Sequence, residues 1–135
     1  GDETVLLVED DPAVTHLLAR VLRKWGYSVL VARGGQEAFE MFEERAHDVD
    51  LVLSDVVMSV VSGPKLLKDL AVAGHRPPFL FLSGFPKDAL AKMESFDLRM
   101  GYLQKPFRTN ELLLRVRELL DALGEDPAPG SEGAD

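Results

Sequence analysis

Two apolar segments of this chain end in carboxylates. Residues 5–8 are followed by Glu9 and Asp10, and residues 49–54 are followed by Asp55. If the segments are neighbouring parallel strands, their carboxyl ends meet at one edge of a sheet and these carboxylates lie close together. Like charges at short range disfavour ionisation unless a cation lies between them, and carboxylate oxygens are ligands that Mg²⁺ prefers. The pattern therefore predicts a magnesium site.

The composition is that of a globular protein and excludes several kinds of site. The chain has 135 residues, of which 46% are hydrophobic, and we expect one domain. It has no cysteine, so disulfides, thiolate metal sites and a cysteine nucleophile are excluded. The net charge of −8 disfavours direct binding of nucleic acid. No apolar run approaches the ~18 residues of a membrane span, so we expect a cytoplasmic protein without membrane insertion.

Short apolar segments alternate with amphipathic helical patterns, which is typical of a parallel α/β sheet. Strands are predicted at Thr4–Val8, Ser28–Ala32, Asp50–Ser54, Phe79–Leu82 and Tyr102–Gln104. Helices are predicted at Pro12–Trp25, Gln36–Arg45, Pro64–Ala73, Asp88–Ser95 and Asn110–Leu123.

The helix boundaries have ordinary signals. Asp11 can cap the first helix with Pro12 at its first position, and Gly26 stands where a C-terminal glycine is favoured. After the last helix the chain is rich in Pro, Gly and acidic residues and has no large apolar side chain. We therefore expect a domain over residues 1–123 and a disordered tail or linker stub over residues 124–135.

Two further polar residues stand at predicted strand ends. Ser83 follows the fourth strand and Lys105 follows the fifth, so a parallel sheet would add a hydroxyl and an ammonium to the edge that carries the carboxylates. Each residue alone has a plain structural explanation, such as a helix-dipole contact or a solvated turn. Their joint occurrence at four strand ends favours one functional site.

In these residues the chain resembles the response-regulator receiver domain of bacterial two-component signalling. The resemblance runs from about Thr4 to Leu123 and rests on four motifs together. The motifs are VLLVEDDP at residues 5–12, DLVLSDVVM at residues 50–58 with Gly63, FLSG at residues 81–84 and YLQKPF at residues 102–107. The last two motifs are also similar to those of receivers in hybrid histidine kinases. The resemblance implies a flavodoxin-like doubly wound (βα)5 fold with strand order 2-1-3-4-5.

The resemblance also implies a phosphoryl and metal site. Asp55 is then the phosphoacceptor for a histidine kinase or a histidine phosphotransfer domain, in a reaction that needs Mg²⁺, with Mn²⁺ as a possible substitute. Asp10 and Asp55 would bind the metal directly, Glu9 through water, and Val57 through its main-chain carbonyl. Lys105 would pair with the phosphoryl oxygens, or with Asp55 before phosphorylation. The peptide bond between Lys105 and Pro106 would be cis.

By the same resemblance the domain is a switch and not an enzyme, beyond catalysing its own phosphorylation and dephosphorylation. Ser83 would hydrogen-bond a phosphoryl oxygen, and Tyr102 would turn inward when Ser83 moves. The face made by the fourth helix, fifth strand and fifth helix would contact an output partner or a second copy. The identity of the output domain or protein stays open.

Two departures from the family pattern leave an alternative open. Ser59 stands where the family usually has proline, followed by Val60 and Val61, and Ser83 stands where threonine is more frequent. The alternative is a degenerate receiver that binds partners without phosphorylation, although such a receiver would normally lack Asp55 or Lys105. A nucleotide-binding module is disfavoured by the acidic loop after the first strand. A haloacid-dehalogenase-like phosphatase is disfavoured because no second acid follows Asp55 two residues on.

Overall fold

The computed structural model describes residues 2–56, 62–84 and 100–124. The predicted helix near Asp88–Ser95, the loop with Ser59 and the predicted tail lie outside the described residues, and so does the Val57 carbonyl. Within the described part, no helix is both long and apolar enough to cross a membrane.

The elements follow the predicted alternation of strands and helices. The strands are β1 (Thr4–Val8), β2 (Ser28–Ala32), β3 (Leu51–Asp55), β4 (Phe79–Ser83) and β5 (Met100–Gln104). The described helices are α1 (Pro12–Lys24), α2 (Gly35–Arg45), α3 (Gly63–Val72) and α5 (Thr109–Gly124). β1 and β2 have the predicted bounds, and the other described elements differ from the predictions by at most two residues at an end. These differences place Asp55 and Ser83 inside β3 and β4 as their last residues.

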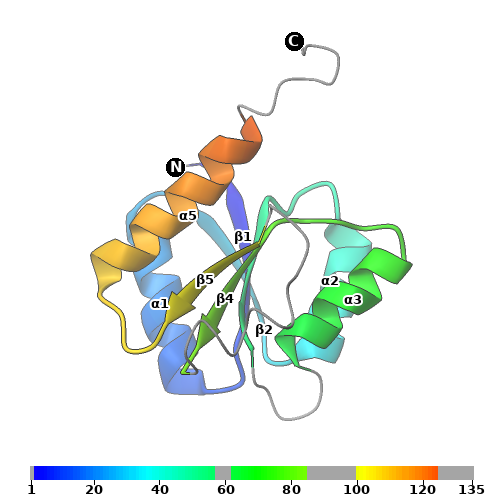
Figure 1. The fold of residues 1–135 in the computed structure, drawn as a ribbon, viewed down its shortest axis with the longest axis horizontal. Coiled ribbons are helices and arrows are strands. Elements are labelled where there is room, and N and C mark those ends of the chain that lie inside the picture. Colours follow the sequence, from blue (N-terminus) through cyan, green and yellow to red (C-terminus); the bar gives the residue numbers. More distant parts are fainter. Residues whose placement is uncertain (1, 57–61, 85–99, 125–135) are drawn as a thin grey trace.

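The strands form one parallel sheet in the predicted order, β2-β1-β3-β4-β5. The register pairs Val8 with Ser54 and Asp55 with Leu82, so β1, β3 and β4 end at nearly the same level. The arrowheads in Figure 1 accordingly point to one edge of the sheet. This edge collects every side chain that the sequence placed at a strand end.

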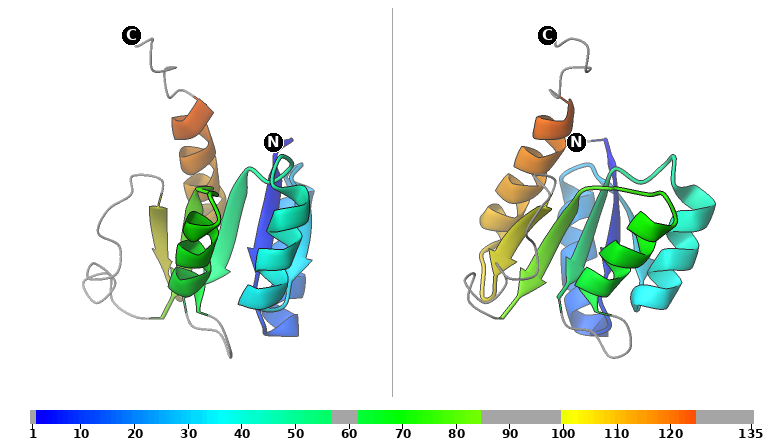
Figure 2. Two further views of the ribbon diagram at one scale, coloured as in Figure 1. Left: turned by 90° about the vertical axis from the view of Figure 1, so that its right-hand side faces the viewer. Right: turned by 45° about the vertical axis from the view of Figure 1, so that its right-hand side comes forward.

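Helices cover both faces of the sheet, and alternate residues of each strand face opposite layers. In β1, Val5 and Leu7 pack in a core with α1 and α5, whereas Leu6 and Val8 pack in a second core with α2 and α3. Figure 2 shows the two helical layers on either side of the sheet. All four of these β1 side chains are fully buried, so the strand is held rigidly from both faces.

The predicted helix boundary signals are present in the structure. Asp11 caps α1 and accepts a hydrogen bond from the Ala13 amide at 2.9 Å, and Pro12 occupies the first turn. Gly26 has φ 98°, a left-handed conformation that favours glycine, after the end of α1. Ser62 caps α3 by accepting from the Lys65 amide at 3.1 Å.

Candidate functional site

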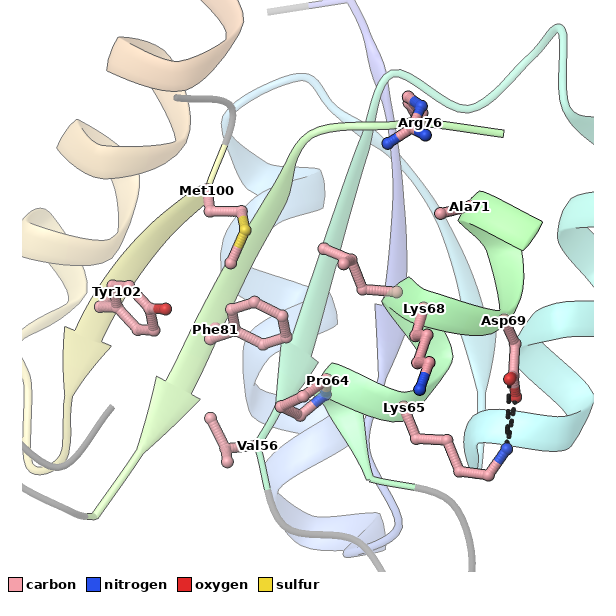
Figure 3. A pocket seen from close by; sticks show the side chains of 11 residues that line it. Val56, Pro64, Lys65, Lys68, Asp69, Ala71, Arg76, Phe81, Met100 and Tyr102 are labelled. Atoms are coloured by element: carbon pink, nitrogen blue, oxygen red, sulfur yellow. Dashed lines mark hydrogen bonds and ion pairs between the residues drawn. The ribbon is translucent and has the colours of Figure 1, made fainter. Parts of the chain in front are cut away.

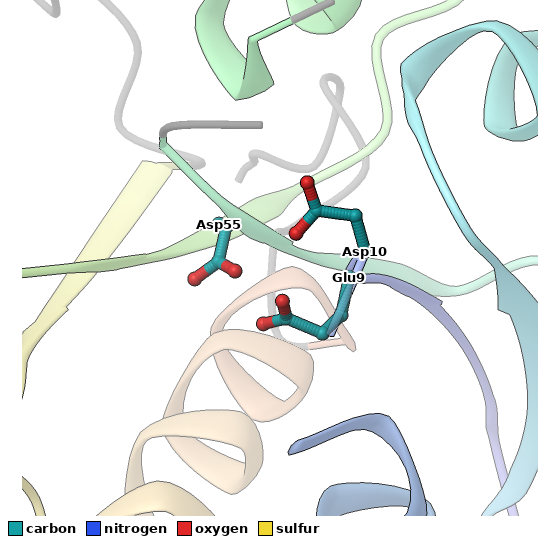
Figure 4. Close-up of side chains that lie close together, drawn as sticks. All are labelled: Glu9, Asp10 and Asp55. Atoms are coloured by element: carbon teal, nitrogen blue, oxygen red, sulfur yellow. The ribbon is translucent and has the colours of Figure 1, made fainter. Parts of the chain in front are cut away.

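The three carboxylates predicted at the strand ends come together in the structure. Glu9 and Asp10 follow β1, Asp55 ends β3, and each of them offers a carboxylate oxygen that lies within 4.8 Å of the other two (Figure 4). Because β1 and β3 are adjacent and parallel, their register alone brings these residues to one place. The arrangement offers several hard oxygen ligands to a divalent cation.

Two of the three carboxylates are buried. Glu9 is 3% exposed and Asp55 is 5% exposed, whereas Asp10 is exposed. Burial, and then the neighbouring Asp55 carboxylate, raise the pKa of Glu9 to about 8. One oxygen of Glu9 accepts from the Asp11 amide at 3.0 Å, but the buried Oε1 has no hydrogen-bond donor among the described residues. A buried oxygen without a donor is a suitable ligand for a cation.

Lys105 supplies the positive charge of the site. Its Nζ lies 2.8 Å from Oδ1 of Asp55, and its side chain is 39% exposed. Burial acts to lower the pKa of Lys105, but the neighbouring carboxylate of Asp55 outweighs it and the pKa is raised. The ammonium is therefore charged at neutral pH.

The backbone before Lys105 is held by the end of β4. The Lys105 amide donates to the Ser83 carbonyl at 2.7 Å, and the register pairs Ser83 with Gln104. The peptide bond from Lys105 to Pro106 is cis, as predicted. Ser83 is itself buried, with 3% exposure, so its hydroxyl belongs to the same edge of the sheet as the carboxylates.

Tyr102 lies further from this edge, on β5. Its ring stacks against Phe81 of β4 with centroids 5.8 Å apart. Both rings line a hollow of about 780 Å³ between these strands and α3, with Val56 at the end of the hollow that lies beside the end of β3 (Figure 3). The hollow gives the Tyr102 side chain space beside the sheet.

Gly63 approaches the site more closely than the sequence indicated. From the sequence, Gly63 is only part of the motif that contains Asp55, and in the structure a Cβ at this position would collide with the carbonyl oxygen of Asp55. It would also lie 3.0 Å from a ring carbon of Phe81 and 3.1 Å from the Ser54 hydroxyl. The Gly63 amide donates to the Val56 carbonyl at 3.0 Å, so the start of α3 is tied to the end of β3. The place of Gly63 in the Asp55 motif was the signal in the sequence, but it did not indicate that the two residues touch.

The model of the response regulator receiver domain family matches residues 5–117. The chain belongs to this family. Among curated relatives, the receiver is 43% identical over 121 residues to "Sensor kinase CckA" of Brucella abortus, an alignment that covers 90% of this chain and 13% of the kinase. It is 34% identical over 117 residues to the transcriptional regulatory protein CpxR of Escherichia coli, covering 86% of this chain and 48% of the regulator. The chain thus spans only part of each relative.

Solved receiver structures agree with this assignment. A crystal structure of the receiver domain of the hybrid histidine kinase CckA is 37% identical, with a TM-score of 0.73, covering 87% of this chain and 98% of that one. The response regulator TrrA of Thermotoga maritima, crystallised in complex with Mg²⁺ and BeF, is 25% identical with a TM-score of 0.72, covering 87% and 98% of the two chains. The flavodoxin-like fold and the two-component family predicted from the motifs are therefore confirmed.

Proposed function

We propose that this receiver accepts a phosphoryl group on Asp55 from a histidine kinase or a histidine phosphotransfer domain, in a reaction that depends on Mg²⁺. The observation that supports the proposal is the position of the Asp55 carboxylate. It is buried at the end of β3, between the ammonium of Lys105 and the carboxylates of Glu9 and Asp10. Burial fixes this carboxylate in position. It faces the Lys105 ammonium and, with the other two carboxylates, offers oxygen ligands to a metal cation.

The arrangement suits phosphoryl transfer, which depends mainly on positioning and charge neutralisation. An Asp55 oxygen would form the new bond to phosphorus while the bond from phosphorus to the donor histidine nitrogen breaks, and that nitrogen keeps the electron pair. No general base is needed, because the reacting form of the carboxylate carries no proton. Lys105, which pairs with Asp55 beforehand, would offset charge on the equatorial oxygens.

The residues fit a bound Mg²⁺. Asp10 and Asp55 are the proposed direct ligands, Glu9 is the proposed ligand through water, and the Val57 carbonyl completes the proposed set. Mn²⁺ accepts the same oxygen ligands and is the proposed substitute. When bound, the ion would neutralise the carboxylates and the charge of the incoming phosphoryl group.

We further propose that phosphorylation shifts a conformational equilibrium. Ser83 lies at the same edge and would donate to a phosphoryl oxygen, and Tyr102 would then move into the hollow beside Phe81. A ligand shifts two states only by its differential affinity, so a swing from 1:99 to 99:1 needs about 5.5 kcal/mol. The output would be read on the face of β5 and α5 together with the predicted fourth helix, by an output domain, a partner or a second copy.

The phosphorylation-independent alternative is not favoured. A receiver without phosphoacceptor chemistry needs neither a buried carboxylate cluster nor an ammonium 2.8 Å from it, and both are present here. Without a bound cation, buried carboxylates this close together destabilise the folded protein through mutual repulsion and loss of hydration. A cation bound by the carboxylates and an anion bound beside Lys105 would each offset these costs.

Intact-mass spectrometry after incubation with acetyl phosphate tests the proposal. We expect a single added phosphoryl group that needs Mg²⁺ and disappears when a chelator is added before the donor. Acetyl phosphate without Mg²⁺ is the control. If the folded protein binds Mg²⁺, as judged by a titration, and still gains no mass, the phosphorylation-independent alternative would be supported instead.

The raised pKa of Glu9 predicts a pH effect on metal-free stability. A carboxyl whose pKa rises from 4.5 to about 8 on folding binds its proton more tightly in the folded state. Its contribution to stability is therefore complete below pH 4.5 and is lost as pH rises through about 8. We expect Glu9→Gln to gain about 1–3 kcal/mol over the wild type between pH 6 and pH 8.5 in chelator.

Urea unfolding at a series of pH values measures this difference. The matched control is Glu40→Gln, which changes an exposed carboxyl on α2. With saturating Mg²⁺ the wild type should instead be more stable than Glu9→Gln, because only the wild type keeps the full carboxylate set. Parallel pH profiles for the wild type and Glu9→Gln would contradict the explanation.

A further inference from the structure

A mainly apolar groove of about 460 Å³ lies between α2 and α3, which are side by side on one face of the sheet (Figure 2). Val72, on its α3 wall, is 82% exposed, more than any other large hydrophobic side chain among the described residues. An apolar side chain this exposed, beside an apolar groove, favours a surface that binds protein. The groove is lined by Gly35, Gln36 and Phe39 of α2 and by Asp69, Val72 and Ala73 at the end of α3.

The two helices beside the groove carry charges of opposite sign. α2 contains four glutamates and one arginine, and all five of these side chains are exposed. α3 contains two exposed lysines and a single aspartate. The groove therefore has an acidic helix on one side and a basic helix on the other.

Some of these charges already have partners within the chain. Glu43 of α2 contacts the ring of His75 at 2.7 Å, and Lys65 of α3 forms an ion pair with Asp69 at 2.9 Å.

Two exposed charges beside the groove are available for an outside partner. Among the described residues, Glu40 and Lys68 have no hydrogen-bond or ion-pair partner. Glu40 stands one helical turn after Gln36, and Lys68 stands one turn before Val72, so both flank the groove. Charges of opposite sign are thus open to solvent on its two sides.

We propose that the groove is an interface between two copies of this chain, related by a twofold axis that runs along the groove. Such an axis places α2 of each copy on α3 of the other, so the acidic helix meets the basic helix twice and each Val72 is covered. A twofold axis across the helices would instead place α2 on α2 and bring glutamates together. Complementary charge therefore selects the axis along the groove.

The charge pattern favours a second copy over other kinds of partner. A nucleic acid or an anionic membrane would be attracted by α3 but repelled by α2 and by the net charge of −8. A uniformly basic peptide would be attracted by α2 and repelled by the lysines of α3. The groove needs a surface that presents both signs in matching positions, and the chain itself has one.

The proposed interface is small. α2 and α3 have 11 and 10 residues, and helices of this size are about 15 Å long. Two such helices bury less than the ~1,200 Å² of a stable specific complex, so we expect a weak dimer with a Kd of about 0.1–1 mM. The pair leaves α1 and α5 uncovered, because they lie on the opposite face of the sheet (Figure 2).

An exchange of charges tests the proposal. The variants are Glu40→Lys and Lys68→Glu, studied separately and as an equal mixture by sedimentation equilibrium at about 150 mM NaCl, where long-range repulsion is screened. Both should fold normally, because each new charge has an opposite charge one turn away on its own helix, at Glu44 and at Lys65. Circular dichroism verifies the fold. Lys24→Glu on α1 is the matched control, because Lys24 is exposed on the opposite face of the sheet.

We expect each variant alone to associate about tenfold more weakly than the wild type, because like charges then face each other at both contacts of the pair. The mixture should associate within about threefold of the wild type. A pair made of one Glu40→Lys copy and one Lys68→Glu copy restores opposite charges at both contacts. Lys24→Glu should associate as the wild type does.

General repulsion between acidic proteins predicts a different order, because Glu40→Lys removes negative charge and would then strengthen association. That order would overturn the proposal. So would a wild type that stays monomeric up to about 2 mM, well above the expected Kd. Equal weakening by Lys24→Glu, or a mixture that associates no better than its two components, would also overturn it.

NMR locates the interface independently. When the ¹⁵N-labelled wild type is diluted from a concentration above the Kd to one far below it, the amide shifts should change on α2 and α3. Changes centred on β5 and α5 would overturn the proposal, since they would place the contact on another face. Neither experiment uses the phosphoacceptor, so both are independent of the proposed function.

Discussion

Asp55→Asn is expected to abolish phosphorylation while the protein stays folded. Asparagine has nearly the same shape as aspartate and fits the same buried position, which is 5% exposed. Its amide is neutral and cannot attack phosphorus as a carboxylate does, and it loses the ion pair with Lys105 at 2.8 Å. The variant should therefore gain no phosphoryl group from acetyl phosphate and Mg²⁺ over a time in which the wild type is fully modified.

The matched control is Asp48→Asn, which changes an exposed aspartate before the start of β3, away from the site. This control should be phosphorylated at the wild-type rate. Intact mass spectrometry follows both variants, and circular dichroism verifies that each is folded. A phosphoryl adduct on Asp55→Asn comparable with that of the control would show that another residue is the acceptor.

Gly63→Ala is expected to produce the largest loss of stability among small substitutions near the site. The new methyl group would collide with the Asp55 carbonyl, which belongs to a buried strand and cannot move without disturbing β3. Crowding of this kind in a packed core costs about 2–3 kcal/mol. The same displacement would shift the Asp55 carboxylate relative to Lys105, so phosphorylation should also slow.

Urea unfolding and the rate of phosphorylation by acetyl phosphate measure these two effects. Gly34→Ala is the control, because a Cβ at Gly34 meets nothing within 4 Å and its φ of −172° is ordinary extended backbone. The control should lose much less stability than Gly63→Ala and keep the wild-type rate. Similar losses in both variants would mean that the approach of Gly63 to Asp55 is not what requires glycine.

Local patterns predicted most of the fold because each of them reports on one element. Alternation of apolar segments and helical stretches was sufficient to predict the parallel sheet, and Asp11, Pro12 and Gly26 marked the ends of α1 correctly. The prediction for β5 began two residues late. Met100 and Gly101 lack a strand signal of their own, and Gly101 belongs to β5 because β4 and Leu119 of α5 pack against it.

The residues of the site were predictable because each stands at the end of a predicted strand. The pKa shift within the site was not predictable. The order of the strands determines that Glu9 and Asp55 meet, but the elevation of the Glu9 pKa depends on burial that only the packed structure shows. The approach of Gly63 to the Asp55 carbonyl has the same origin.

Reductive trapping of the phosphorylated protein tests the central claim most directly. Borohydride reduces an acyl phosphate on aspartate to homoserine, and peptide mass spectrometry then locates the changed residue. After treatment with acetyl phosphate and Mg²⁺, we predict homoserine at position 55 and at no other aspartate, and none in samples prepared without Mg²⁺. Homoserine at position 10 or elsewhere, or a phosphoryl group that survives borohydride, would contradict the assignment of Asp55 as the phosphoacceptor.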